Sequence, residues 1–72
     1  MRDLIIEVIN RTFGIDSANE STSQQNCDKW DSLNHLNLVI ELEATFNVSL
    51  EPEDIAEMTD VKSIEQIIGG KR

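Results

Sequence analysis

The hydrophobic positions of the chain fall into helical periods that are separated by polar segments. Between residues 2 and 13, apolar or methyl-bearing side chains recur in adjacent pairs four positions apart, which predicts one amphipathic helix. Gly14 then suits the left-handed position that ends many helices, and Ile15 supplies the hydrophobic contact of such a cap. The pairs on the helix are Leu4 and Ile5, Val8 and Ile9, and Thr12 and Phe13.

The segment from residue 32 to residue 46 predicts a second helix, with more apolar surface than one core needs. Asp31 and Ser32 are good N-cap residues at its start. An ordinary surface helix has one apolar stripe. Here, at about 100° per residue, one arc contains Leu38, Val39, Leu42 and Phe46, and a roughly opposite arc contains Leu33, Leu36, Ile40 and Ala44. We therefore assign the first arc to the core and expect the second arc to be exposed, Leu36 included.

The remaining segments complete a small bundle. Residues 16–29 form a long polar connection without a hydrophobic period. Pro52 suits the first turn of a short third helix, and Asp60 is placed to cap a fourth helix, which we expect Gly69 and Gly70 to end. The sequence thus predicts an all-α fold. It is a small four-helix bundle of three longer helices and one short third helix, with a long loop between helices one and two.

Length and charge restrict the classes of partner. The 72 residues allow a single domain with a modest core. The formal charge of −8 argues against binding to nucleic acids or anionic membranes, because both favour Lys and Arg. No Lys or Arg occurs between Lys29 and Lys62, whereas Asp and Glu are frequent there. That acidic half is suited to steering toward partners with basic surfaces; the competing interpretation is a surface that is acidic only for solubility.

The single cysteine, Cys27, bears on the compartment. It cannot form an intrachain disulfide, which favours a reducing environment. No apolar run approaches the length that spans a bilayer, and the N-terminus lacks the pattern of a signal peptide. We therefore expect a cytoplasmic monomer in which Cys27 is an inert small side chain.

The sequence contains no catalytic or metal-binding constellation. One His and one Cys do not make a zinc site, and the acidic residues between 51 and 54 lack the spacing of a calcium loop. Ser32 and His35 are three positions apart on one predicted helix, but no third group orients them, so a hydrolase is not expected. Taken individually, Ser32 is a helix cap, and Trp30 and His35 are packing residues. We predict no metal site and no enzymatic activity.

The order of these features is more informative than any one of them. Asp31-Ser32-Leu33 opens the helix with two apolar arcs. The other informative positions are Phe13-Gly14-Ile15, Val48 and Leu50, Glu53-Asp54, and Met58-Thr59-Asp60-Val61. Together they closely resemble the acyl carrier protein family over nearly the whole chain. In that family the serine of the triplet carries 4′-phosphopantetheine, whose thiol holds the cargo as a thioester. By position this serine is Ser32, at a predicted helix N-terminus, where an attached phosphodiester is favoured.

The resemblance implies a carrier that acts through other enzymes. A phosphopantetheinyl transferase would attach the arm from coenzyme A. Enzymes that load and transfer acyl or aminoacyl groups would bind the exposed arc through basic docking surfaces. The docking residues that we expect are Asp31, Leu33, Leu36, Ile40, Glu41, Glu43 and Met58.

Several residues depart from the pattern of fatty-acid-synthesis carriers. Asn34, Asn37 and Ala44 occupy positions that are often acidic there, and Trp30 replaces a small or aliphatic residue. These departures favour a dedicated carrier for a specialised acyl or aminoacyl group in a biosynthetic pathway. The alternatives are a peptidyl or aminoacyl carrier protein and, from another class, a non-enzymatic acidic helical adaptor without a prosthetic group.

Overall fold

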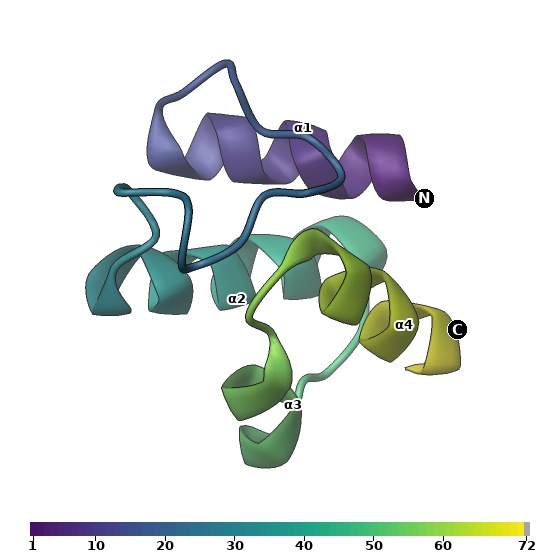
Figure 1. Ribbon diagram of the computed structural model, residues 1–72. Coiled ribbons are helices and arrows are strands. Elements are labelled where there is room, and N and C mark those ends of the chain that lie inside the picture. The colour runs from purple at the N-terminus through teal and green to yellow at the C-terminus, as the bar shows by residue number, and fades with distance from the viewer. Residues whose placement is uncertain (72) are drawn as a thin grey trace.

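Four helices build the described part of the chain, which comprises residues 1–71 of a computed structural model. Helices α1 and α2 run antiparallel, α4 packs against α1, and the short α3 lies at one side of the molecule (Figure 1). Their bounds are α1 Arg2–Phe13, α2 Ser32–Phe46, α3 Pro52–Glu57 and α4 Val61–Lys71. The predicted all-α fold, with three longer helices and a short third one, is confirmed.

Helix α1 turns most of its predicted apolar face to the core. Leu4 is the exception, because 38% of it is exposed. The predicted left-handed cap is confirmed: Gly14 has φ 68° and ψ 37°, and its N–H donates to the carbonyl of Asn10. The N–H of Ile15 donates to the same carbonyl at 3.0 Å, and Ile15 packs against the core. The buried residues of α1 are Ile5, Val8, Ile9 and Phe13.

Helices α2 and α4 supply much of the remaining core. The buried residues of α2 are Leu38, Val39, Leu42 and Phe46, which form the arc that was assigned to the core from the sequence. The buried residues of α4 are Val61, Ile64 and Ile68. Asn47 ends α2 in the left-handed conformation, with φ 55°, and Leu50 is buried just beyond it. The C-terminal end of α2 is therefore fixed by local residues.

The loop between α1 and α2 is held in place by backbone hydrogen bonds to the first residue of α4 and to the connection between α3 and α4. The carbonyl of Thr22 accepts from the N–H of Val61 at 3.1 Å, and the N–H of Gln24 donates to the carbonyl of Thr59 at 2.9 Å. Thr22 is buried, and Cys27 packs half-buried against the core. In Figure 1 this loop crosses the face of the molecule before α2 begins. A segment without a hydrophobic period is thus fixed by contacts that are distant in sequence.

A reciprocal cap starts α4. The N–H of Ser63 donates to Oδ1 of Asp60 at 2.7 Å, and the N–H of Asp60 is 3.2 Å from Oγ of Ser63. The hydrogen bond from the backbone N–H of Ser63 to the carboxylate, and after it a contribution from the Ser63 side chain, lower the pKa of Asp60. The prediction that Asp60 caps this helix is confirmed.

The prediction that Gly69 and Gly70 end α4 is wrong, because the helix continues through both residues to Lys71. Neither glycine adopts a positive φ, so neither forms a left-handed cap. The side chain of Lys71 lies 2.8 Å from Oδ2 of Asp54 in α3, and this ion pair holds the last turn of α4 against α3. The hydrogen bond from Lys71 lowers the pKa of Asp54, and the same contact raises the pKa of Lys71.

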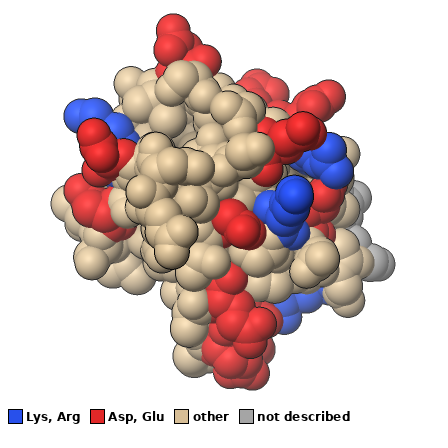
Figure 2. Space-filling view, in the orientation of Figure 1, with Lys and Arg blue, Asp and Glu red and all other residues tan. Residues whose placement is uncertain are grey.

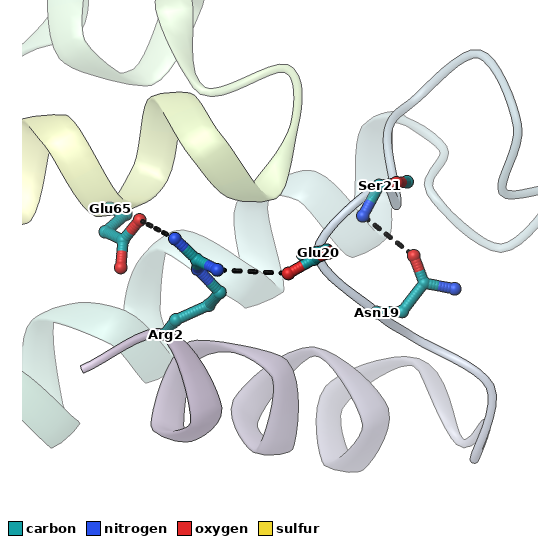
Figure 3. A network of polar contacts seen from close by, with 5 residues as sticks. All are labelled: Arg2, Asn19, Glu20, Ser21 and Glu65. Carbon is teal, nitrogen blue, oxygen red and sulfur yellow. Dashed lines mark hydrogen bonds and ion pairs between the residues drawn. The ribbon is translucent and has the colours of Figure 1, made fainter.

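Arg2 connects the start of α1 to two other parts of the chain (Figure 3). Its guanidinium lies 3.0 Å from a carboxylate oxygen of Glu20 in the loop and 3.4 Å from one of Glu65 in α4. In the same view the N–H of Ser21 donates to the side-chain oxygen of Asn19 at 2.7 Å. Exposed ion pairs contribute little stability, so these contacts mainly orient the loop.

Candidate functional site

Ser32 is the first residue of α2, and Asp31 is the N-cap. The carboxylate of Asp31 accepts from the N–H of Asn34 at 2.8 Å. Ser32 is therefore not the capping residue, and its side chain is exposed at the positive end of the helix. Among residues 1–71, its hydroxyl has no hydrogen-bond partner. The hydroxyl of the serine that the sequence singled out is thus not engaged by any described residue.

Trp30 is fixed directly before the site. It is only 4% exposed, and its ring meets the edge of Phe13 at a centroid distance of 5.6 Å. The indole N–H donates to Nδ1 of His35 at 2.9 Å. Because this nitrogen accepts, Nε2 carries the proton and donates to the carbonyl of Ile55 at 2.8 Å.

His35 therefore does more than pack. It connects Trp30, which precedes α2, to Ile55 in α3, and both of its ring nitrogens are used. The sequence correctly placed His35 at a half-buried position, but gave no sign of this hydrogen-bonded bridge. These two hydrogen bonds of His35 fix the position of the segment that leads into Ser32.

An open depression lies beside Ser32. Its volume is about 570 Å³, and loop residues and the first two turns of α2 line it. The lining residues are Gln24, Trp30, Asp31, Ser32, His35 and Leu36. A second hollow, of about 330 Å³, lies further along α2 between Arg11, Thr12, Asn37, Ile40 and Glu41.

The second apolar arc of α2 faces solvent, as predicted. Leu33 is 69% exposed, Leu36 is 56% exposed and Ile40 is 60% exposed, and Ala44 is exposed as well. Single exposed apolar residues are common, but three large ones along one helix face form a contiguous patch. We call Leu33, Leu36 and Ile40 the apolar face of α2.

The predicted acidic rim of this face is only partly available. Glu41 lies 3.4 Å from the guanidinium of Arg11. Glu43 is half-buried, and its carboxylate accepts from the N–H of Leu50 at 2.9 Å. It therefore holds the turn after α2.

The prediction that Met58 belongs to the docking surface is wrong, because its side chain is completely buried in the core. Its position at the end of α3 turns it inward, and a partner cannot contact it in this structure.

The acidic side chains of the described residues are spread over the surface and are not gathered as metal ligands. Within residues 1–71, no group of three or more His, Cys, Asp or Glu side chains is placed to hold a metal ion. Figure 2 shows acidic side chains gathered over α3, with basic side chains in separate places on the same face. In the same part of the chain, no helix has the length and apolarity to cross a membrane.

Comparison with known proteins identifies the fold in which this site lies. No protein-family model matches the sequence, and no curated protein matches it. Among solved structures, the chain is similar to a holo acyl carrier protein from Geobacter metallireducens, with 25% identity and a TM-score of 0.87. The match covers 97% of this chain and 83% of that one. The chain has the acyl carrier protein fold. The resemblance to this family that the sequence indicates over nearly the whole chain is thereby confirmed at the level of the fold.

The residues at the start of α2 in this acyl carrier fold fit a phosphopantetheine group. Ser32 is exposed, and Asp31 accepts from the N–H of Asn34, so among residues 1–71 the N–H groups of Ser32 and Leu33 have no hydrogen-bond partner. A phosphodiester on Ser32 would be stabilised by these donors and by the helix dipole.

Proposed function

We propose that the protein is a carrier whose Ser32 bears 4′-phosphopantetheine, with an acyl or aminoacyl group held on the arm as a thioester. The observation that carries the proposal is the exposed, unpartnered hydroxyl of Ser32 at the N-terminus of α2, in a chain with the acyl carrier protein fold. Among residues 1–71, no side chain is hydrogen-bonded to that hydroxyl as a general base would be, and both nitrogens of His35 are engaged elsewhere. A separate phosphopantetheinyl transferase must therefore activate it.

In the attachment reaction, this chain supplies only the serine hydroxyl that is modified. In the transfer, Oγ of Ser32 forms a bond to the phosphorus of the phosphopantetheinyl group of coenzyme A. Adenosine 3′,5′-bisphosphate leaves, and the serine proton passes to the transferase. The group then supplies a thiol for thioester formation. The residues around Ser32 contribute a rigid helix start, donors for the phosphodiester and a docking surface.

The apolar face of α2 is the surface that we assign to partner enzymes. Leu33 adjoins Ser32, and Leu36 and Ile40 extend the face along the helix. Asp31 and Glu41 supply negative charge at its edges, which favours partners with basic docking surfaces and mainly accelerates association. The partners are the transferase and the enzymes that load and transfer the cargo.

The cargo belongs to a specialised biosynthetic pathway in this proposal. Asn34, Asn37 and Ala44 place no charge at positions that are often acidic in fatty-acid-synthesis carriers. The side chain of Asn34 instead donates to the carbonyl of Lys29 at 2.7 Å. The start of α2 is therefore tied to its own loop, and its partners differ from those that select a strongly acidic helix.

Intact-mass measurement tests the proposal. The protein is incubated with coenzyme A and a broad-specificity phosphopantetheinyl transferase, and one arm should be added to the wild type and none to Ser32→Ala. Ser49→Ala is the matched control, because Ser49 is also exposed but lies after α2; it should be modified like the wild type. A wild type that stays unmodified would contradict the proposal and favour an adaptor without a prosthetic group.

A further inference from the structure

Gln24 places a carboxamide at the edge of the depression beside Ser32. Its backbone is fixed, because its N–H donates to the carbonyl of Thr59 at 2.9 Å. The side-chain nitrogen lies 3.5 Å from Nδ1 of His35. That nitrogen already accepts from the indole of Trp30 at 2.9 Å, and a neutral imidazole offers one acceptor site.

The carboxamide of Gln24 is therefore held near the depression without a good hydrogen-bond partner. The shorter contact from Trp30 occupies the lone pair of His35, so the contact from Gln24, at 3.5 Å, is at most marginal. Both the donors and the acceptor of the carboxamide are therefore available to a group that enters the depression.

The lining of the depression combines this polar group with apolar surface. Trp30 and Leu36 supply the apolar part, and Ser32 lies on the same lining. The volume of about 570 Å³ is in the range of small-molecule sites. The polar part of the lining also includes Asp31 and His35.

We propose that this depression seats the first part of the arm on Ser32, with the Gln24 carboxamide hydrogen-bonded to the arm's first amide. The inference rests on the proposed function. In 4′-phosphopantetheine a dimethyl-bearing unit follows the phosphate, and an amide follows that unit. The lining offers both kinds of group, apolar surface from Leu36 and Trp30 and a carboxamide from Gln24. The tether to Ser32 raises the effective concentration of the arm at the depression, so weak contacts suffice.

Trp30 provides a readout that does not depend on activity. It is the single tryptophan of the chain and lines the depression. We would record its fluorescence and its indole N–H signal in an NMR spectrum, before modification and after intact mass shows complete modification. In the wild type, seating of the arm should shift both signals.

Gln24→Ala and Gln25→Ala form the matched pair, because both glutamines are exposed neighbours in one loop and Gln25 does not line this depression. Gln25→Ala should retain the wild-type shift. Gln24→Ala should lose part of it, with a fall of roughly 2- to 10-fold in the ratio of seated to free arm, as expected for one net hydrogen bond.

The outcomes separate the two proposals. If the wild type is fully modified and neither Trp30 signal changes, the seat is refuted while the carrier function stands. An unreduced shift in Gln24→Ala would refute the role of Gln24. If no arm can be attached to the wild type, both proposals fail. The comparison of modified and unmodified wild type requires no variant, so it decides the existence of the seat even if Gln24→Ala were to unfold.

Discussion

Leu36→Ala and Leu42→Ala should separate docking from folding, because two leucines of one helix lie in opposite environments. Leu36 is 56% exposed, whereas Leu42 is completely buried. Leu36→Ala should change the free energy of unfolding by no more than about 0.5 kcal/mol, as surface substitutions usually do. Leu42→Ala removes core contacts and leaves a cavity, which should cost about 2–5 kcal/mol. Urea denaturation followed by circular dichroism measures both changes.

The effect of Leu36→Ala on the binding of partner enzymes can be calculated from the exposed fraction of the Leu36 side chain. Complete burial of a leucine side chain contributes about 1.5–3 kcal/mol. A partner that covers the exposed 56% of Leu36 would gain roughly 0.8–1.7 kcal/mol from it. The variant should therefore lower kcat/KM for modification by the transferase about 4- to 17-fold. The upper part of this range is a limit, since alanine retains one methyl group.

Steady-state modification rates, followed by intact mass at low carrier concentration, measure this effect. Ser49→Ala serves again as the control for an exposed substitution off the apolar face of α2. Wild-type kinetics for Leu36→Ala would refute the docking assignment. Unfolding of Leu36→Ala with an intact Leu42→Ala would show that the two arcs of α2 have been exchanged.

Two further predictions concern stability. Asp60→Ala removes the cap from Ser63 and should cost about 0.5–2 kcal/mol in urea denaturation at pH 7. The lowered pKa of Asp60 makes its contribution complete above the ordinary value of 3.8, and the contribution is lost as the pH falls through the lowered value, so the variant and wild type should converge in acid. Gly69→Ala should stabilise the protein by about 0.5–1 kcal/mol, because Gly69 is helical and nothing lies within 4 Å of an added Cβ; a lower melting temperature would contradict this.

The helices could be predicted from the sequence because local signals decide them. The bounds of α1 and α2 follow from apolar periods and from the caps at Gly14 and Asp31. The exposure of Leu36 was predictable by angle alone, since the opposite arc already filled the core side of α2. Where side chains follow a 3.6-residue period, sequence and structure agree.

The errors arose where a residue's partner lies in another segment. Glu43 looked like a rim carboxylate, but the turn after α2 brings the N–H of Leu50 to it. Met58 was assigned to the surface, but the turn after α3 directs it into the core. Gly69 suggested a helix end by composition, whereas the ion pair of Lys71 with Asp54 provides a tertiary reason for α4 to continue.

The surroundings of Ser32 show the same division between local and distant causes. Asp31 and the helix dipole act on Ser32 from adjacent positions, so the sequence could indicate Ser32 as the proposed attachment site once the triplet was combined with the pattern of the whole chain. Gln24 is held near the same place by the hydrogen bond of its N–H to Thr59, and His35 joins Trp30 to Ile55 of α3 through its two ring nitrogens. The features that distinguish this carrier are therefore set by the loop and α3. Substitutions in these two segments should change how the arm is held without changing whether Ser32 is modified.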